Sequence, residues 1–289
     1  MGGGPPRPSD LSSVLSAPSR TVAGVATLVS FHAHPDDECI GTGGVMRKAS
    51  DEGHRVVLVV ATSGEQGEVP EGFLADGEQL WQRRVAETLA SAEILGVHRT
   101  EFLGYRDSGM MGRPTNQAAG SFWTTPVEEA ARRLAAILRE ERADVLTCYD
   151  DNGGYGHPDH IQVHRVGMRA AELAGTARVF QNTINRDHLL SGLQEYAAQA
   201  AEAGVEMPDI DTTGEGFGKP QSMITAAVDV SPYLKHKRAA MRAHASQIGE
   251  QSFFLSMPAE GFGHAFGTEW FIREGQGPGI TETDLLAGL

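Results

Sequence analysis

Short apolar runs alternate along this chain with segments of helical periodicity, and this alternation limits the possible folds more than any other feature. The run TVAGVATLVSF (21–31) predicts a buried strand, and RVVLVVAT (55–62) predicts a second strand after a helical stretch at 44–52. Two strands joined through a helix make a parallel βαβ unit. The alternation continues, with strands expected at 97–103, 144–149, 178–184, 223–230 and 269–274 and helices at 81–95, 126–142, 158–174 and 232–247.

The repeated pattern predicts an α/β, Rossmann-like fold in which a mostly parallel sheet carries helices on both faces. We expect a single domain over residues 21–289, because no internal repeat interrupts the pattern. Residues 1–20 are rich in Gly, Pro and Ser and predict a disordered leader. At 187–222 the alternation gives way to a helical piece and a loop-like stretch, which is typical of a lid or a substrate wall.

The composition argues against two classes of partner. The formal charge is −14 and no run of Lys and Arg stands out, so neither nucleic acid nor an anionic membrane is expected to bind. No stretch reaches the roughly 18 apolar residues of a membrane span, and the start lacks the basic and then apolar order of a signal peptide. We therefore expect a cytoplasmic protein. Cys39 and Cys148 are expected to be free thiols, and the oligomeric state stays open.

Two stretches gather histidines and acids where predicted strands end. FHAHPDDECIGTGG (31–44) follows the first strand, and YDDNGGYGHPDHIQVH (149–164) follows the fourth. Ligands of open parallel sheets collect beyond the carboxyl ends of the strands, and the first and fourth strands are commonly neighbours in a doubly wound sheet. We therefore expect both stretches to face one crevice.

A metal ion would explain this concentration of charge. A hydrolytic zinc site needs about three His, Asp or Glu ligands and one open position for water, and His34, Asp37 and His160 would supply the ligands. Either motif alone also fits a plainer interpretation. His34 and Asp36 could form a surface ion pair, and HPDH (157–160) could be a capped helix start. Finding both motifs at strand ends favours the metal site.

The motifs AHPDDE (33–38) and GGYGHPDH (153–160) resemble the LmbE-like or PIG-L-type N-deacetylase family. Members of this family are zinc-dependent amidases that act on N-acylated amino sugars and related small molecules. The resemblance extends over about residues 28–273. It includes GEQGE (64–68), RVAE (84–87), YRDSGM (105–110) and RAHASQ (242–247).

The resemblance implies that His34, Asp37 and His160 bind zinc and that Asp36 is the general base. Zinc lowers the pKa of its water to about 7, and a carboxylate that does not bind the metal can accept the proton as the water attacks an amide. A site of two His and one Asp also accepts Fe(II), so iron remains possible.

The resemblance also implies roles for three residues of the second motif. His157 matches the family residue that serves the tetrahedral oxyanion and the leaving amine, and Asp159 matches the carboxylate that orients it. Tyr155 matches a tyrosine that helps to polarise the carbonyl in mycothiol-pathway members.

Glu68, Arg84 and Asp107 match positions that hold the sugar end of the substrate in the mycothiol branch. Each has a plainer alternative from the residues alone: Arg84 and Glu87 could be an ordinary i, i+3 helix pair, and 64–68 could be a solvated turn.

Three further residues near the motifs are interpreted as supporting ones. His164 lies four residues after His160, a spacing that puts two ligands on one helix face, but three ligands are already assigned. We expect His164 and His32 to pack around the site and Cys39 to be a small buried side chain.

Two other functional classes were weighed against the deacetylase. Two His and one carboxylate also make the facial triad of a non-haem iron oxygenase, but Asp36 adds an unligated carboxylate suited to hydrolysis. GTGG (41–44) suggests a nucleotide-binding loop, but it does not fit G-x-G-x-x-G. The substrate stays open among a mycothiol precursor, a mycothiol S-conjugate and an antibiotic sugar, because the loops at 70–80, 111–125 and 187–222 would choose among them.

Overall fold

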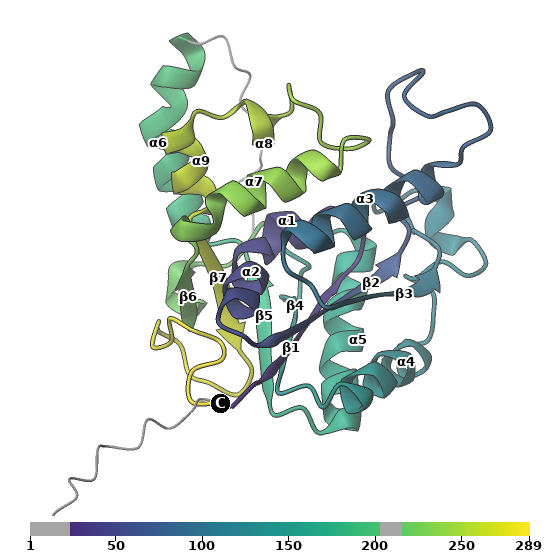
Figure 1. Cartoon of the computed structure of the whole chain (residues 1–289), viewed down its shortest axis with the longest axis vertical. Coiled ribbons are helices and arrows are strands. Elements are labelled where there is room, and N and C mark those ends of the chain that lie inside the picture. Colours follow the sequence, from purple (N-terminus) through teal and green to yellow (C-terminus); the bar gives the residue numbers. More distant parts are fainter. Residues whose placement is uncertain (1–23, 203–215) are drawn as a thin grey trace, which may run out of the picture.

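The chain forms one seven-stranded sheet between two layers of helices (Figure 1). The computed structural model describes residues 24–202 and 216–289, and for 195–202 it describes the backbone only. The strand order is β3-β2-β1-β4-β5-β7-β6. The strands are β1 (Thr27–His32), β2 (Arg55–Thr62), β3 (Arg99–Tyr105), β4 (Val145–Tyr149), β5 (Arg178–Thr183), β6 (Ala226–Asp229) and β7 (Thr268–Arg273).

Helices cover both faces of the sheet, as the sequence predicts. Their bounds are α1 (Asp37–Gly41), α2 (Gly43–Asp51), α3 (Leu80–Ile94), α4 (Val127–Glu140), α5 (Pro158–Ala174), α6 (Arg186–Glu202), α7 (Leu234–Ala243), α8 (Phe253–Ser256) and α9 (Ala259–Phe266). The pair α4 and α5 packs on one face, and α2, α3 and α7 pack on the other (Figure 1). The first five strands in this order pair in parallel, whereas β7 pairs antiparallel with both β5 and β6.

Alternation along β1 and β2 explains why both faces must be covered. Val29 and Val57 belong to the apolar cluster under α4 and α5, whereas Leu28 and Val56 belong to the cluster under α2 and α7. All four side chains are fully buried. A strand that is apolar on both faces occurs where helices shield both sides.

Most predicted elements are present, although the short helices α8 and α9 were not predicted and three other differences concern element bounds and α1. The first strand begins at Thr27, not at 21, and the predicted leader 1–20 lies outside the described residues. The helix predicted over 44–52 is preceded by α1, which the sequence did not predict. The last predicted helix ends at Ala243, because residues 244–247 turn away to bond with buried acids.

The glycines of GTGG serve packing and not a nucleotide. A Cβ on Gly44 would lie 2.4 Å from Cβ of Val230, so only glycine fits there. The backbone amides of Gly44 and Val45, at the start of α2, donate to the two carboxylate oxygens of Glu269 at 2.8 Å each. Those amides would hold a phosphate in a dinucleotide site, and Glu269 already occupies them.

Glu269 also pairs with Lys237, and both side chains are buried. Replacing Glu269 with Gln leaves a buried ammonium without its countercharge. The free energy of unfolding in urea should fall by roughly 3–5 kcal/mol. The matched control is Glu250→Gln in the exposed Arg242–Glu250 pair, which should leave the urea midpoint nearly unchanged. Equal effects of the two variants would contradict this prediction.

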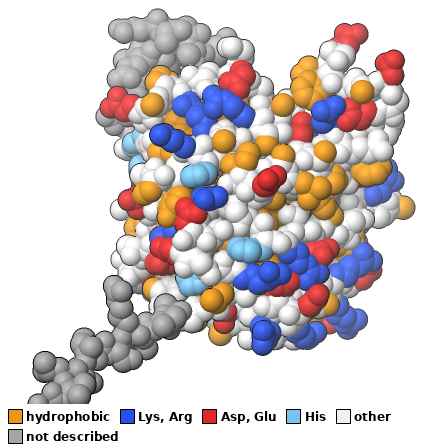
Figure 2. All heavy atoms as spheres, in the orientation of Figure 1, with side chains coloured by type: hydrophobic (Ala, Val, Ile, Leu, Met, Phe, Trp, Pro, Cys, Tyr) orange, Lys and Arg blue, Asp and Glu red, His pale blue; other side chains and the backbone are white. Residues whose placement is uncertain are grey.

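The described part of the surface carries charges of both signs. Figure 2 shows acidic and basic side chains interspersed on one face, with apolar side chains gathered near α3, where Trp81 and Leu89 are exposed. Among the described residues, no helix is both long enough and apolar enough to cross a membrane.

Candidate active site

The two motifs meet at the carboxyl ends of β1 and β4, which are neighbours in the sheet. Ser30 pairs with Thr147 in the parallel register, so the segments that follow the two strands start side by side. The first segment turns sharply at Asp36, whose φ of 96° is rare for a residue with a side chain. The second segment reaches α5 through a glycine-rich loop. The predicted crevice at the switch point of the sheet is therefore present.

Asp37 lies between the two predicted histidine ligands. Its Oδ2 atom is 3.3 Å from Nδ1 of His34 and 3.3 Å from Nε2 of His160. Two ligand atoms that each lie about 2.0–2.2 Å from a tetrahedral zinc are about 3.3–3.6 Å apart. The distances from Asp37 to each of the two histidines are therefore those that a tetrahedral ion requires. One ring nitrogen of each of His34, His157 and His160 lies within 4.8 Å of the other two, so His157 lies beside the two predicted histidine ligands.

The hydrogen bonds of both histidines leave a lone pair facing Asp37. His160 Nδ1 lies 3.2 Å from the Gly153 carbonyl, so this nitrogen carries the proton. Its buried Nε2 has no hydrogen-bond partner among the described residues. His34 Nε2 lies 3.1 Å from the Asp159 carboxylate, which leaves Nδ1 free to bind an ion. Metal-binding histidines are commonly fixed through their second nitrogen in this way.

The electrostatics of the site favour a cation. Burial lowers the pKa of His34, but the carboxylates of Asp107, Asp159 and Asp37 outweigh it and raise this pKa well above its usual range. Burial raises the pKa of Asp37, but His160 and His34 outweigh it and hold this pKa well below its usual range. The cluster therefore attracts a positive charge, whether a proton or a metal ion.

Asp36 is held apart from this cluster by Arg84. The Arg84 guanidinium donates to Asp36 Oδ2 at 3.1 Å and to the carbonyls of Pro35 and Gly64. Burial raises the pKa of Asp36 to about 6, and the Arg84 charge limits the rise. A carboxyl with this pKa is mostly ionised at pH 7 and is still basic enough to accept a proton.

Arg84 lines the cavity and also holds Asp36. It is buried, and its described hydrogen bonds go to Asp36 and to the carbonyls of Pro35 and Gly64, so its contact with a sugar stays a prediction. The alternative pair with Glu87 is also absent from the described contacts, because Glu87 accepts hydrogen bonds from Ser246.

His157 is the N-cap of α5 and faces the cavity. Its Nδ1 accepts a hydrogen bond from the Asp159 amide at 3.1 Å, which leaves the proton on Nε2. Burial, with His34 and His160 nearby, lowers the pKa of His157 to about 3. The ring is therefore neutral at pH 7 and offers one N–H donor.

The carboxylate of Asp159 contacts His34, whereas the predicted partner was His157. The sequence assigned it to orient His157, but only its backbone amide contacts that ring. The carboxylate accepts from His34 Nε2 and from the amide and hydroxyl of Ser108. Because Asp159 is the second residue of α5, its side chain points back across the crevice toward β1 and orients His34.

A cavity of about 280 Å³ opens beside these groups. Glu68 is exposed at its edge, and Asp107 is buried with one oxygen 3.4 Å from His34 Nε2. Tyr155 is 43% exposed, and its ring centroid lies 4.9 Å from that of His160. The structure thus brings all ten predicted site residues to this cavity or its immediate wall. The lining residues that the sequence did not single out are Gln66, Gly67, Gly109, Met110 and Arg113.

Tyr149 is a further residue that the sequence analysis missed. Its ring stacks on His160 with centroids 4.5 Å apart, and its hydroxyl bonds His32 Nδ1 at 2.8 Å. His164 contacts the Tyr149 carbonyl through Nδ1 at 3.0 Å. His32 and His164 therefore support the site from behind, as expected. Cys39 and Cys148 are buried free thiols, as predicted.

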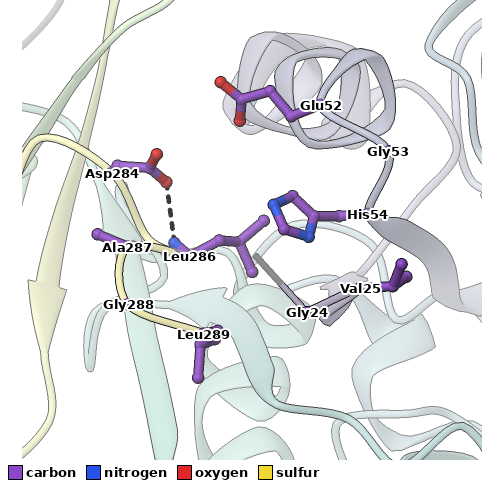
Figure 3. A pocket seen from close by; sticks show the side chains of 10 residues that line it. All are labelled: Gly24, Val25, Glu52, Gly53, His54, Asp284, Leu286, Ala287, Gly288 and Leu289. Atoms are coloured by element: carbon purple, nitrogen blue, oxygen red, sulfur yellow. Dashed lines mark hydrogen bonds between the residues drawn. The ribbon is translucent and has the colours of Figure 1, made fainter. Parts of the chain in front are cut away.

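A second cavity, of about 310 Å³, lies at the amino ends of β1 and β2 (Figure 3). His54 points into it beside Leu286, but its Nδ1 accepts the Ala26 amide. Asp284 accepts from the Leu286 amide and from Lys48. These polar groups of the second cavity hold the C-terminal segment against α2, so the first cavity is the candidate active site.

Comparison with known proteins places this geometry in a family. The GlcNAc-PI de-N-acetylase (PIG-L) family matches residues 29–171. The chain is 41% identical over 289 residues to 1D-myo-inositol 2-acetamido-2-deoxy-alpha-D-glucopyranoside deacetylase of Salinispora arenicola, and the match covers 91% of each protein. It is also 41% identical to the enzyme of that name from Thermobifida fusca, over 90% of this chain and 98% of that one. The chain belongs to the PIG-L family.

Solved structures agree with this assignment. N,N'-diacetylchitobiose deacetylase from Pyrococcus horikoshii matches 86% of this chain and 83% of its own, with a TM-score of 0.53 and 25% identity. A deacetylase of the teicoplanin biosynthesis pathway shares the fold at 16% identity, with a TM-score of 0.57 over 87% of this chain and all of its own. This PIG-L family member is thus a deacetylase, an amide hydrolase with a cluster able to hold a metal ion.

Gly153 gives a test of how His160 is placed. Its φ is +63°, and an added Cβ would lie 2.4 Å from Cβ of His160. Gly153→Ala should therefore displace His160 and weaken metal binding by at least about 10-fold, measured by competition with a chelator. Gly156→Ala carries the same backbone strain at φ +88°, but its Cβ meets nothing within 4 Å. Equal losses in both variants would show that strain alone matters.

Proposed function

We propose that this protein is a zinc-dependent N-deacetylase that removes the acetyl group from a 2-acetamido-2-deoxyglucopyranoside linked to myo-inositol. The observation that supports the metal is the position of Asp37 Oδ2, 3.3 Å from one nitrogen of each of two histidines. The substrate follows from relatives that match nine-tenths of the chain and carry that activity in their names.

His34, Asp37 and His160 would hold the ion. A bound zinc ion would polarise the acetamide carbonyl and lower the pKa of water to about 7. Asp36, fixed by Arg84 and not needed as a ligand, accepts the proton as the water attacks the carbonyl carbon. Asp159 keeps His34 in the tautomer that presents Nδ1 to the ion.

The oxyanion that forms next needs a donor within the cavity. His157 supplies its Nε2–H, because its Nδ1 is fixed by the Asp159 amide and its ring is neutral. Tyr155 lies on the exposed side of the same cavity, and its hydroxyl donates a second hydrogen bond to the carbonyl oxygen. When the carbon–nitrogen bond breaks, Asp36 returns its proton to the nitrogen and the second proton of the water stays on the acetic acid; the released products then ionise to acetate and a protonated amine.

Asp107 and Glu68 would bind the sugar. Both line the cavity, and carboxylates accept hydrogen bonds from sugar hydroxyls. Asp107 is preorganised by the amides of Gly109 at 2.8 Å and Gln66 at 3.1 Å. Glu68 is exposed and contributes at the rim, where a second ring would leave the cavity.

Measurements of metal content and kcat can distinguish the roles of the adjacent residues Asp36 and Asp37. Asp37→Ala and His160→Ala should lose metal and activity together. Asp36→Ala should keep one equivalent of metal and lose about 10²–10⁴-fold in kcat, because only the base is removed. His164→Ala is the matched control, since His164 lies one turn further along α5 and contacts the Tyr149 carbonyl. Wild-type turnover by Asp36→Ala would contradict the general-base role.

Amine release from a substrate panel tests the proposed reaction. The panel contains the inositol-linked 2-acetamido glucoside, a thiol conjugate of the same scaffold, N,N'-diacetylchitobiose and N-acetylglucosamine. We expect kcat/KM to be highest for the inositol glycoside with zinc, and reconstitution with Fe(II) without oxygen compares the two metals. Preference for the thiol conjugate would move the substrate to the amidase branch, and release from no member would overturn the proposed substrate.

A further inference from the structure

Beyond Arg84, which fixes Asp36, the motifs RVAE (84–87) and RAHASQ (242–247) have no place in the reaction described so far. The structure joins them through one face of α3. Arg84, Glu87 and Ser91 follow one another at i, i+3 and i+7, so they point the same way. Arg84 bonds Asp36, Glu87 bonds Ser246, and Ser91 bonds Glu38. This face therefore holds both the active-site turn and the segment after α7.

Glu38 is the centre of this arrangement. One carboxylate oxygen, Oε1, accepts from the Ser91 hydroxyl at 2.6 Å and lies 2.6 Å from Nε2 of His244. The other oxygen, Oε2, accepts from the backbone amide of Asp36 at 2.9 Å. Glu38, Ser91 and His244 are fully buried, so these bonds are shielded from water. Side chains from three elements, α1, α3 and the end of α7, thus meet one step from the proposed base.

The backbone of Asp36 needs this support. Its φ of 96° and ψ of −30° lie in a region that residues with a side chain rarely adopt, so the conformation is strained. Such a conformation persists only when surrounding contacts hold it. Glu38 Oε2 binds the amide of the strained residue, and Arg84 binds its carboxylate.

We propose that Glu38 and His244 form a positioning pair that holds Asp36 in its strained conformation, so that its carboxylate is presented to the attacking water. The inference rests on the proposed function, because it gives the pair a purpose only if Asp36 is the base. Neither residue touches substrate or metal. The rest of the segment adds to the same support, because Gln247 donates to the Glu68 carbonyl in the loop that lines the cavity.

A double-mutant cycle tests the pair. Glu38→Ala should lower kcat by about 10–100-fold with KM within about 2-fold and one equivalent of metal retained. Glu38→Gln, which keeps an acceptor for the Asp36 amide, should recover most of the loss. In an Asp36→Ala background Glu38→Ala should cost nothing further, because a residue that acts through Asp36 has no effect once that carboxylate is gone.

Glu87→Gln is the matched control. Glu87 is a second buried carboxylate between α3 and the same segment, but it bonds Ser246 and not the active-site turn. This variant should lower Tm and leave kcat within about 2-fold. If Glu38→Ala and Glu87→Gln lowered kcat equally, or if the losses of Glu38→Ala and Asp36→Ala multiplied, the pair would be merely structural and the inference would be overturned.

The same cycle separates this inference from its premise. If Asp36→Ala turned over at the wild-type rate, the general-base role of Asp36 would be wrong. If Asp36→Ala were slow but Glu38→Ala kept the wild-type rate, only the positioning pair would be overturned. Should Glu38→Ala fail to fold, Ser91→Ala and His244→Phe each remove one bond to Oε1 and enter the same cycle. Losses that multiply with that of Asp36→Ala in both variants would overturn the inference, whereas a loss of kcat that appears only when Asp36 is intact would support it.

Discussion

The burial of several carboxylates at one end of the sheet is the constraint on which the rest of the site depends. A buried carboxylate is costly unless a cation or several donors compensate it. Asp37 and Asp159 are compensated by imidazoles, Asp36 by a guanidinium, and Glu38 by a hydroxyl and an imidazole. Asp107 adds a further negative charge near His34. A cation between the imidazoles and Asp37 would reduce this excess of negative charge.

Three consecutive acids end in three different environments because the backbone turns at the first of them. The positive φ of Asp36 separates its side chain from that of Asp37, and the start of α1 then directs Glu38 into the core. In the proposed reaction this separation lets Asp37 bind the metal while Asp36 remains the base. A regular helix or strand through residues 36–38 would not divide them in this way.

The sequence predicted the fold and the gathering of the site, but not how the site groups pair. Strand and helix periodicity gave the elements, and the carboxyl-end rule brought His34 and His160 together. The hydrogen-bond partner of the Asp159 carboxylate could not be predicted from the sequence, because it depends on how α5 is rotated against β1. The end of α7 was also placed too late, since a helical pattern continues through residues whose buried bonds to Glu38 and Glu87 pull them out of the helix. These two bonds join residues that are 206 and 159 positions apart, so a local sequence pattern cannot predict them.

The starts of α2 and α5 show how one physical feature serves two purposes in this fold. Helix α2 follows β1 and the short α1, helix α5 follows β4, and both present free amides at their starts. At α2 the amides bond the buried carboxylate of Glu269, so the glycines before it join two layers of the protein. At α5 the imidazole of His157 takes the Asp159 amide and is oriented by it, which leaves the other face of the ring open to the cavity. The helix start at α2 is closed by an acid from the core and joins two layers, whereas the start at α5 is closed by a histidine at the cavity wall, which in the proposed reaction is a fixed donor. The difference lies in the capping side chain, and the fold itself is the same at both places.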